Sequence, residues 1–277
     1  MHASTVRTLL VRGMIAGVLA GLFAFALAYL AGEPSVRDSI ALEETQSAPA
    51  AEHAHAPAAA TAHEHGEEEE ELVSRPVQST FGLATGVLVY GVALGGIASL
   101  VFSVCLGRIG GFGPRATAAL IAGAAFTTVY LVPFLKYPAT PPAVGNPDTI
   151  GKRTTLFFLM IVLSVLLAVV AVIAGRRLAP KLGNWNASVV AGAGYVVAVA
   201  VACLVLPANS DAVRETFPAA LLWEFRLASV AVQALLWTAF GLIFGALAER
   251  VLQPGGRGAS AARTDADGVT SPVRTVG

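Results

Sequence analysis

The feature that most constrains the fold of this 277-residue chain is a series of apolar blocks of membrane-spanning length. A helix needs about 20 mostly apolar residues to cross a bilayer. Six blocks meet this requirement, and none has a charged residue in its middle; they cover residues 13–31, 81–106, 116–135, 156–174, 187–206 and 228–248. The pattern predicts an all-α protein, a polytopic transmembrane helical bundle of six spans that occupies residues 1–252.

Lysine and arginine are distributed unevenly between the segments that join these blocks. If the six spans cross alternately, one side carries eleven of the 18 Lys and Arg residues but only three of the 18 Asp and Glu residues. Cytoplasmic loops carry an excess of Lys and Arg, so this side is predicted to be cytoplasmic. We therefore expect a multi-pass protein of the bacterial cytoplasmic (inner) membrane, with both termini in the cytoplasm. Residues 253–277 are polar and predict a disordered cytoplasmic tail.

The first block has two interpretations. Its basic residues, apolar run and Ala26-Leu27-Ala28 resemble a cleavable signal peptide, which would leave five spans. However, Gly13, Gly17 and Gly21 share one helix face, where small residues let helices approach closely in lipid. The same spacing recurs in Gly82/Gly86, Gly91/Gly95 and Gly241/Gly245. We favour a retained helix in a compact bundle.

A polar stretch, residues 33–76, separates the first two blocks and carries four of the five histidines. It contains two His-x-His pairs, each beside a glutamate, and then five consecutive glutamates. Alternate residues of an extended chain point to the same side, so each pair could chelate one ion. The candidate metal ligands are His53, His55, His63, His65, Glu52, Glu64, Glu67 and Glu68.

This ligand set indicates loose, exchangeable binding in an extracytoplasmic loop rather than a rigid structural site. Imidazole and carboxylate suit several transition metals, so the ligands alone do not choose between Co²⁺, Ni²⁺ and Zn²⁺. The other interpretation is a solvated linker that binds metal only incidentally.

The extracytoplasmic ends of the spans supply a second group of candidates. Pro133 frees a backbone carbonyl near the end of the third block, which either lines a cavity or marks a rigid connector. Glu224 lies close to the sixth block and either guides cations or anchors the helix at the interface. The candidate path or outer-mouth residues are Glu43, Glu44, Lys136, Tyr137, Asn146 and Glu224.

Several function classes lack their sequence motifs. The chain contains no GxxxxGK[ST], HExxH or GxSxG pattern, so we expect no enzyme activity. It has no long basic run, so we expect no nucleic-acid partner. No carboxylate or histidine lies in the middle of a span, where proton-coupled carriers usually keep one.

A set of short patterns links the chain to one known family. They are RTLLVRG (7–13), ALEE (41–44) before the His-rich stretch, LVSRPVQ (72–78), KYP (136–138), PPAVG (141–145), FPA (217–219), LW (222–223) and FR (225–226). With them, residues 6–252 resemble the CbtA family of predicted cobalt transporter subunits. The resemblance implies cobalt uptake across the inner membrane and a small single-span partner with its own histidines, CbtB. It also implies five spans, one fewer than the block count.

The leading hypothesis is an integral membrane subunit of a cobalt (divalent transition-metal) uptake transporter, surrounded by lipid and able to form a homo-oligomer. The alternative is a membrane metal-sensing or accessory metal-binding protein that does not transport. A third reading is a structural membrane protein in which the polar stretch is a linker.

Overall fold

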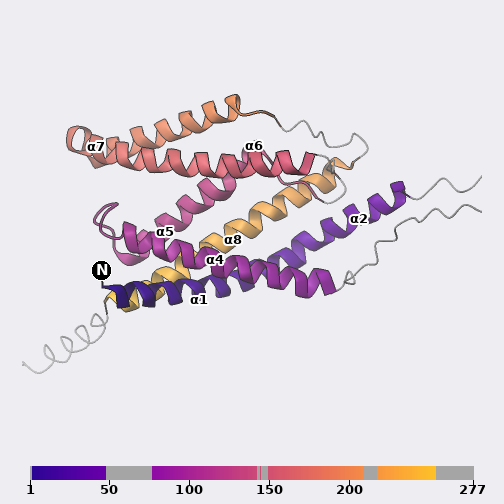
Figure 1. Cartoon of the computed structure of the whole chain (residues 1–277), viewed down its shortest axis with the longest axis horizontal. Coiled ribbons are helices and arrows are strands. Elements are labelled where there is room, and N and C mark those ends of the chain that lie inside the picture. Colours follow the sequence, from indigo (N-terminus) through magenta and orange to yellow (C-terminus); the bar gives the residue numbers. More distant parts are fainter. Residues whose placement is uncertain (1, 48–76, 142–143, 145–148, 209–216, 254–277) are drawn as a thin grey trace, which may run out of the picture.

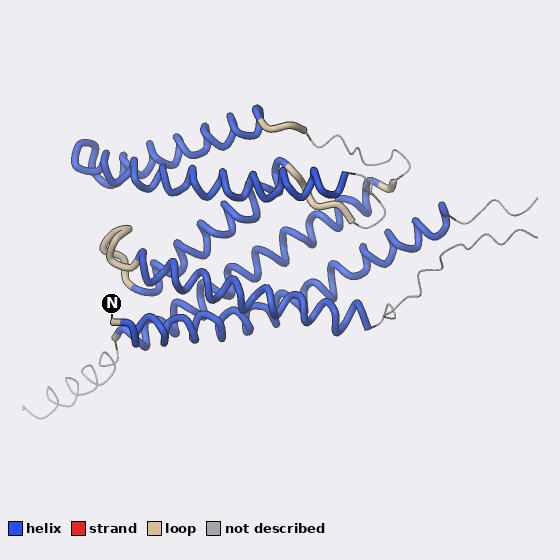
Figure 2. The backbone as a smooth tube through the Cα atoms, in the orientation of Figure 1, coloured by secondary structure: helices blue, strands red, loops and turns tan. Residues whose placement is uncertain are grey.

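The computed structural model describes residues 2–47, 77–141, 144, 149–208 and 217–253, and every regular element in these ranges is helical (Figures 1 and 2). Five of the described helices are long and apolar enough to cross a membrane. The predicted fold class, a polytopic helical bundle, is therefore confirmed. The segment 254–277, predicted to be a disordered tail, lies outside the described residues.

The first span continues beyond the first apolar block. Helix α1 (Ala3–Leu27) passes through a π-helical segment, η1 (Ala28–Gly32), directly into α2 (Glu33–Ser47). Such π-helical turns contain one extra residue and are frequent at functional sites. The polar stretch that was predicted to form a loop from residue 33 therefore begins as helix.

Glycines bring α1 against the second span, which consists of η2 (Gln78–Gly82) and α4 (Leu83–Cys105). Gly13 and Gly17 of α1 lie against Gly91 and Gly95 of α4. A Cβ added at Gly91 would lie 2.5 Å from the carbonyl oxygen of Gly17, so no larger residue allows this approach without displacing the backbone. The predicted role of these small residues in close packing is confirmed.

A second small-residue seam joins the third span to the last one. The third span consists of α5 (Pro114–Ala125), η3 (Phe126–Leu131) and α6 (Val132–Lys136), and α5 packs on α8 (Ala219–Leu252). A Cβ added at Gly241 would lie 2.9 Å from the Cβ of Ala122, and a Cβ added at Gly245 would lie 3.3 Å from the Cα of Arg115. The predicted Gly241/Gly245 motif therefore also makes a helix contact.

The core of the bundle lies between these two seams. Leu9 and Ala16 of α1 are completely buried there, together with Phe102 of α4 and Phe244 of α8. The Phe102 and Phe244 rings meet edge to face, with centroids 5.1 Å apart. Because α1 contributes so much of this core, its packing is that of an integral helix of the bundle.

Helix α7 (Ile150–Val205) explains why five helices are found where six spans were predicted. The fourth and fifth apolar blocks both lie within α7, in which two helical arms meet at a non-helical residue. Its backbone turns at Gly183, where φ is 78° and ψ is 159°, and its two arms run side by side in Figure 1. The predicted count of six spans is one more than the five span-length helices described, because α7 holds two of the predicted blocks in its two arms.

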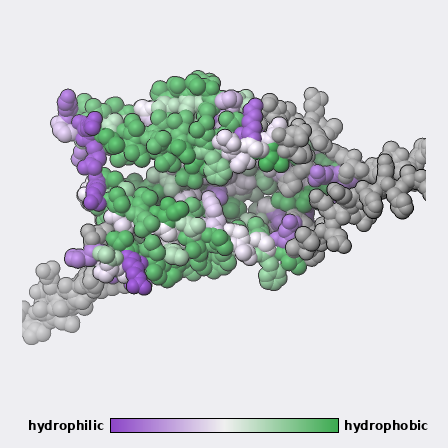
Figure 3. All heavy atoms as spheres, viewed as in Figure 1, coloured by the Kyte–Doolittle hydropathy of each residue, from purple (hydrophilic) through white to green (hydrophobic). Residues whose placement is uncertain are grey.

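The α7 hairpin forms an outer layer. It contacts the rest of the bundle mainly through η3 and α6, and only 11% of its most apolar window is buried, against 28–33% in the other spans. Figure 3 shows a broad hydrophobic surface over the helices, with hydrophilic residues gathered at the end where the N-terminus lies. This distribution suits a bundle surrounded by lipid.

Candidate functional site

The metal ligands predicted in the polar stretch lie outside the residues that the structure describes. The same holds for Asn146; the full set is His53, His55, His63, His65, Glu52, Glu64, Glu67, Glu68 and Asn146. Within the described ranges, no group of three or more His, Cys, Asp or Glu side chains could hold a metal ion. The flanks of the stretch are described: α2 ends at Ser47 and η2 begins at Gln78, both at the end of the bundle opposite the N-terminus (Figure 1).

The other predicted carboxylates at this end are solvent-accessible. Glu43 and Glu44 lie in the last turns of α2, and Glu224 lies in the second turn of α8; all three side chains are exposed. These side chains face the medium at this end and are not part of the buried core. Their charge can attract cations to this end.

Tyr137 fixes the position of the C-terminal end of the third span. Its hydroxyl donates a hydrogen bond to the carbonyl oxygen of Pro207, just after α7, at 2.9 Å. The side chain is 7% exposed, and this burial raises the pKa of the Tyr137 phenol. The Lys136 ammonium lies 5.8 Å from the centroid of the same ring. Arg226 of α8 donates to the Ala139 carbonyl at 3.3 Å, so three spans are connected at this end.

Glu33, which was not among the predicted site residues, is the most deeply buried charged residue of the part of the chain that the structure describes, and it lies in the half of the first span away from the N-terminus. It follows η1 directly and is 6% exposed, and Ser35 and Ser39 beside it are also buried. The Arg37 guanidinium lies 4.0 Å from its carboxylate, and both η1 and α2 contact α8. Burying an ionised carboxylate is costly unless cations compensate it. Its position two residues after the first apolar block was the available sequence signal.

The opposite end of the bundle is held by two arginines. Arg12 of α1 donates to the Leu247 carbonyl of α8 at 2.8 Å. Arg115 of α5 pairs with Glu249 of α8 at 2.7 Å. These contacts join three spans at the end that the charge distribution predicts to be cytoplasmic.

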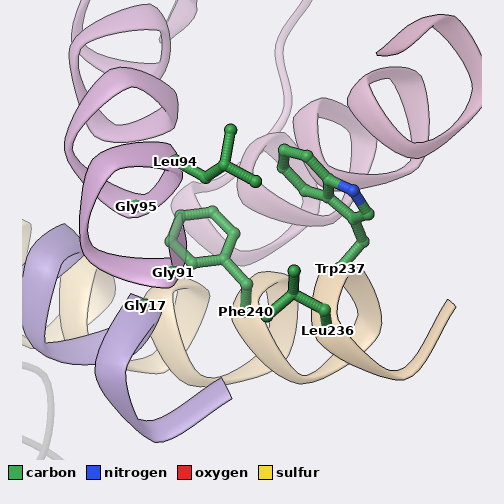
Figure 4. A pocket seen from close by; sticks show the side chains of 7 residues that line it. All are labelled: Gly17, Gly91, Leu94, Gly95, Leu236, Trp237 and Phe240. Atoms are coloured by element: carbon green, nitrogen blue, oxygen red, sulfur yellow. The ribbon is translucent and has the colours of Figure 1, made fainter. Parts of the chain in front are cut away.

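The space between α1, α4 and α8 is nearly closed. Seven residues line a cavity of about 10 Å³: Gly17, Gly91, Leu94, Gly95, Leu236, Trp237 and Phe240 (Figure 4). This volume holds about one water molecule. A hydrated ion therefore cannot pass along the α1–α4 seam in this conformation.

Comparison with protein families matches residues 6–249 to the family described as "Probable cobalt transporter subunit (CbtA)". The chain belongs to the CbtA family. The CbtA match runs from the start of α1 almost to the end of α8 and so includes the whole bundle. No curated protein and no solved structure matched the chain.

Membership in CbtA agrees with the multi-pass helical architecture and with the predicted cobalt transport. The CbtA description is that of a transport subunit rather than an enzyme, and a subunit works with at least one further component. The description names cobalt, and neither Ni²⁺ nor Zn²⁺ appears in it.

Proposed function

We propose that this chain is the membrane-embedded subunit of a cobalt uptake transporter, and that residues 48–76 collect Co²⁺ outside the membrane for passage into the bundle. The family match over residues 6–249 carries the proposal. Both flanks of the His/Glu stretch leave the same end of the bundle, which supports a collecting role at that end (Figure 1).

The proposed route begins at the two His-x-His pairs and their neighbouring glutamates. Glu43 and Glu44 then attract the ion along α2 toward the buried Glu33. Lys136, Tyr137 and Glu224 are proposed to contribute to the mouth at the same end of the bundle, together with Asn146, which lies outside the described residues. Loose ligands suit the first step, because an ion that is to be transported must leave again.

The proposal places the protein in the bacterial inner membrane with both termini in the cytoplasm. The clustering of Arg12 and Arg115 at one end of the bundle agrees with this orientation. The further component is proposed to be a small single-span protein with its own histidines, as in CbtB, and a homo-oligomer is compatible with it.

Uptake of radioactive cobalt at nanomolar metal tests the proposal, with nickel as competitor. Cells express the chain with and without the single-span partner, and one variant carries alanine at His53, His55, His63 and His65. We expect uptake that depends on the chain, with a raised KM and an unchanged maximal rate in the variant. His2→Ala, which changes the one remaining histidine at the other end of the bundle, is the matched control.

The other outcomes separate the alternatives. Uptake that the four alanines leave unchanged would make the stretch a linker. Metal binding without uptake in any combination would instead indicate a sensing or accessory protein.

A further inference from the structure

The turn between the two arms of α7 is strongly basic. Residues 150–205 contain five Lys and Arg residues and no Asp or Glu. Three of these cations, Arg176, Arg177 and Lys181, lie close together just before Gly183, where the backbone reverses. All three side chains are exposed, and residues 180–186, which complete the turn, are exposed as well.

The lengths of the two arms place this turn at the level of the lipid headgroups. The apolar block of the first arm, residues 156–174, corresponds to about 28 Å of helix, close to the thickness of the hydrocarbon core. The block of the second arm, residues 187–206, has a similar length and begins directly after the turn. Residues 175–186 therefore lie outside the hydrocarbon. Trp185 among them is 80% exposed, and tryptophan is enriched at this interface.

The positive charge of the turn is not neutralised within the part of the chain that the structure describes. No Asp or Glu side chain there lies within ion-pair distance of the three cations. Glu249, the one described acid at this end of the bundle, pairs with Arg115. Arg177 and Lys181 are four residues apart and share a helix face, where like charges destabilise the helix. The C-terminus of the first arm compensates only about half an elementary charge.

The rest of the bundle leaves the turn uncovered. Helix α7 contacts the other spans mainly through η3 and α6, which form the half of the third span away from this end. Helix α5, the half nearer the turn, is not among the main contacts of α7. In Figure 3 hydrophilic atoms cover the α7 layer at this end. The three cations are therefore accessible from the membrane surface.

The side chains of the turn suit a lipid phosphate. An arginine guanidinium binds phosphate oxygens through two parallel N–H bonds, and a lysine ammonium adds a compact positive charge. The exposed indole of Trp185 and the amides of Asn184 and Asn186 provide further donors. Each Lys or Arg near the surface adds to the attraction of anionic lipids, so the group favours headgroups with a net negative charge over zwitterionic ones.

We propose that Arg176, Arg177, Lys181 and Trp185 form a docking surface for the headgroups of anionic phospholipids, in the leaflet on the N-terminal side of the bundle. The bound phosphates neutralise the Arg177/Lys181 pair and hold the end of the α7 layer that the bundle leaves uncovered. An acidic polypeptide would match the charge equally well. However, both apolar arms lead from the lipid phase directly into the turn, and only 11% of the most apolar window of α7 is buried. The surface is independent of the proposed transport function.

Binding of phospholipids to the purified full chain, measured by native mass spectrometry from detergent, tests this surface. Phosphatidylglycerol and phosphatidylcholine with the same acyl chains are titrated separately, and the bound molecules are counted. One variant combines Arg176→Gln, Arg177→Gln and Lys181→Gln. We expect the parent to bind phosphatidylglycerol roughly tenfold more tightly than phosphatidylcholine, and this variant to raise the apparent Kd for phosphatidylglycerol about tenfold or more.

The matched control removes the same charge from exposed positions at the same end of the bundle. It combines Arg7→Gln, Arg108→Gln and Arg250→Gln. We expect the control to change the apparent Kd less than about threefold, because these cations are spread over three elements rather than grouped in one turn. Lys181→Gln alone should raise the Kd severalfold, which decides the question if the α7 triple variant does not fold.

Three outcomes would overturn the proposal. An equal loss of affinity in both triple variants would replace the α7 surface with a general effect of charge at this end. Equal affinity of the parent for the two lipids would reject the recognition of anionic headgroups. Hexaglutamate is the competitor, and displacement of phosphatidylglycerol by less peptide than lipid would assign the surface to an acidic polypeptide instead.

Discussion

Replacing Gly91 with alanine tests the α1–α4 seam at a point of very close approach. The added Cβ would lie 2.5 Å from the carbonyl oxygen of Gly17 and 3.2 Å from its carbonyl carbon. Ordinary contact begins at 3.4 Å, so the two backbones must separate by about 0.9 Å. A gap of this size forfeits roughly a quarter to a half of the dispersion energy of the contacts that it opens.

The expected cost follows from two opposing effects. Overpacking a close contact typically costs about 1–3 kcal/mol, whereas alanine in place of glycine favours the helix by about 1 kcal/mol. We therefore expect a net loss of up to roughly 2 kcal/mol in the free energy of unfolding, and each kcal/mol lost lowers Tm by about 2–4 °C.

Thermal unfolding in detergent, followed by circular dichroism, measures this loss. Gly86→Ala is the matched control, because a Cβ there meets nothing within 4 Å and only the gain in helix propensity remains. The control should be as stable as the parent or more so. Equal stability of the Gly91 and Gly86 variants would refute the reasoning.

Four further predictions concern the Glu33 and Tyr137 end of the bundle and the first helix. Glu33→Gln should lower cobalt uptake severalfold, while Asp38→Asn at an exposed position of α2 should leave it near the parent value, as measured by initial uptake rates. Equal effects would contradict a special role for the buried carboxylate. Tyr137→Phe should cost about 1 kcal/mol, because the Pro207 carbonyl loses its donor. Burial raises the pKa of Tyr137 above its ordinary value of 10.0, so the phenol ionises first in the unfolded chain as the pH rises. The free energy of unfolding should therefore not depend on this group below pH 10.0 and should fall above it. A free energy of unfolding that stays constant above this pH would contradict the prediction. A tag fused before Ala3 should remain on the membrane-inserted protein in immunoblots, because loss of α1 would uncover Phe102 and the α4 glycines.

Much of the fold could be predicted from the lengths and spacing of apolar residues. Gly13 and Gly17 were correctly assigned to a helix contact, because small residues four apart must share a face. The pattern does not show which glycines contact another helix. Gly82 and Gly86 have the same spacing as Gly91 and Gly95, yet a Cβ added at Gly86 would contact nothing within 4 Å. Partner choice depends on the tilt and depth of both helices, which local spacing does not encode.

The sequence was less informative about the reversal in α7 and about the interior of the bundle. Two apolar blocks with a basic link predict two spans, and the structure holds both blocks in α7, whose two arms meet at the non-helical Gly183. Gln233 is a single neutral residue in an apolar block, so the sequence pattern does not distinguish it. The structure shows that its side-chain oxygen and the indole nitrogen of Trp237 are buried without a hydrogen-bond partner among the described residues. The ligands at residues 52–68 remain a prediction.

The π-helical segment η1 determines which face of α2 each of its side chains occupies relative to the side chains of α1. In an uninterrupted α-helix each residue turns by about 100°, so Glu33, nine residues after the buried Ala24, would face half a turn away from the core. One extra residue in η1 brings Glu33 back by about 100°, toward the side where it is buried. The length of this short apolar segment, rather than the identity of its side chains, therefore decides whether the carboxylate points into the protein or into the surrounding medium. Homologous chains that differ by one residue between Ala28 and Gly32 would carry the same glutamate on a different face.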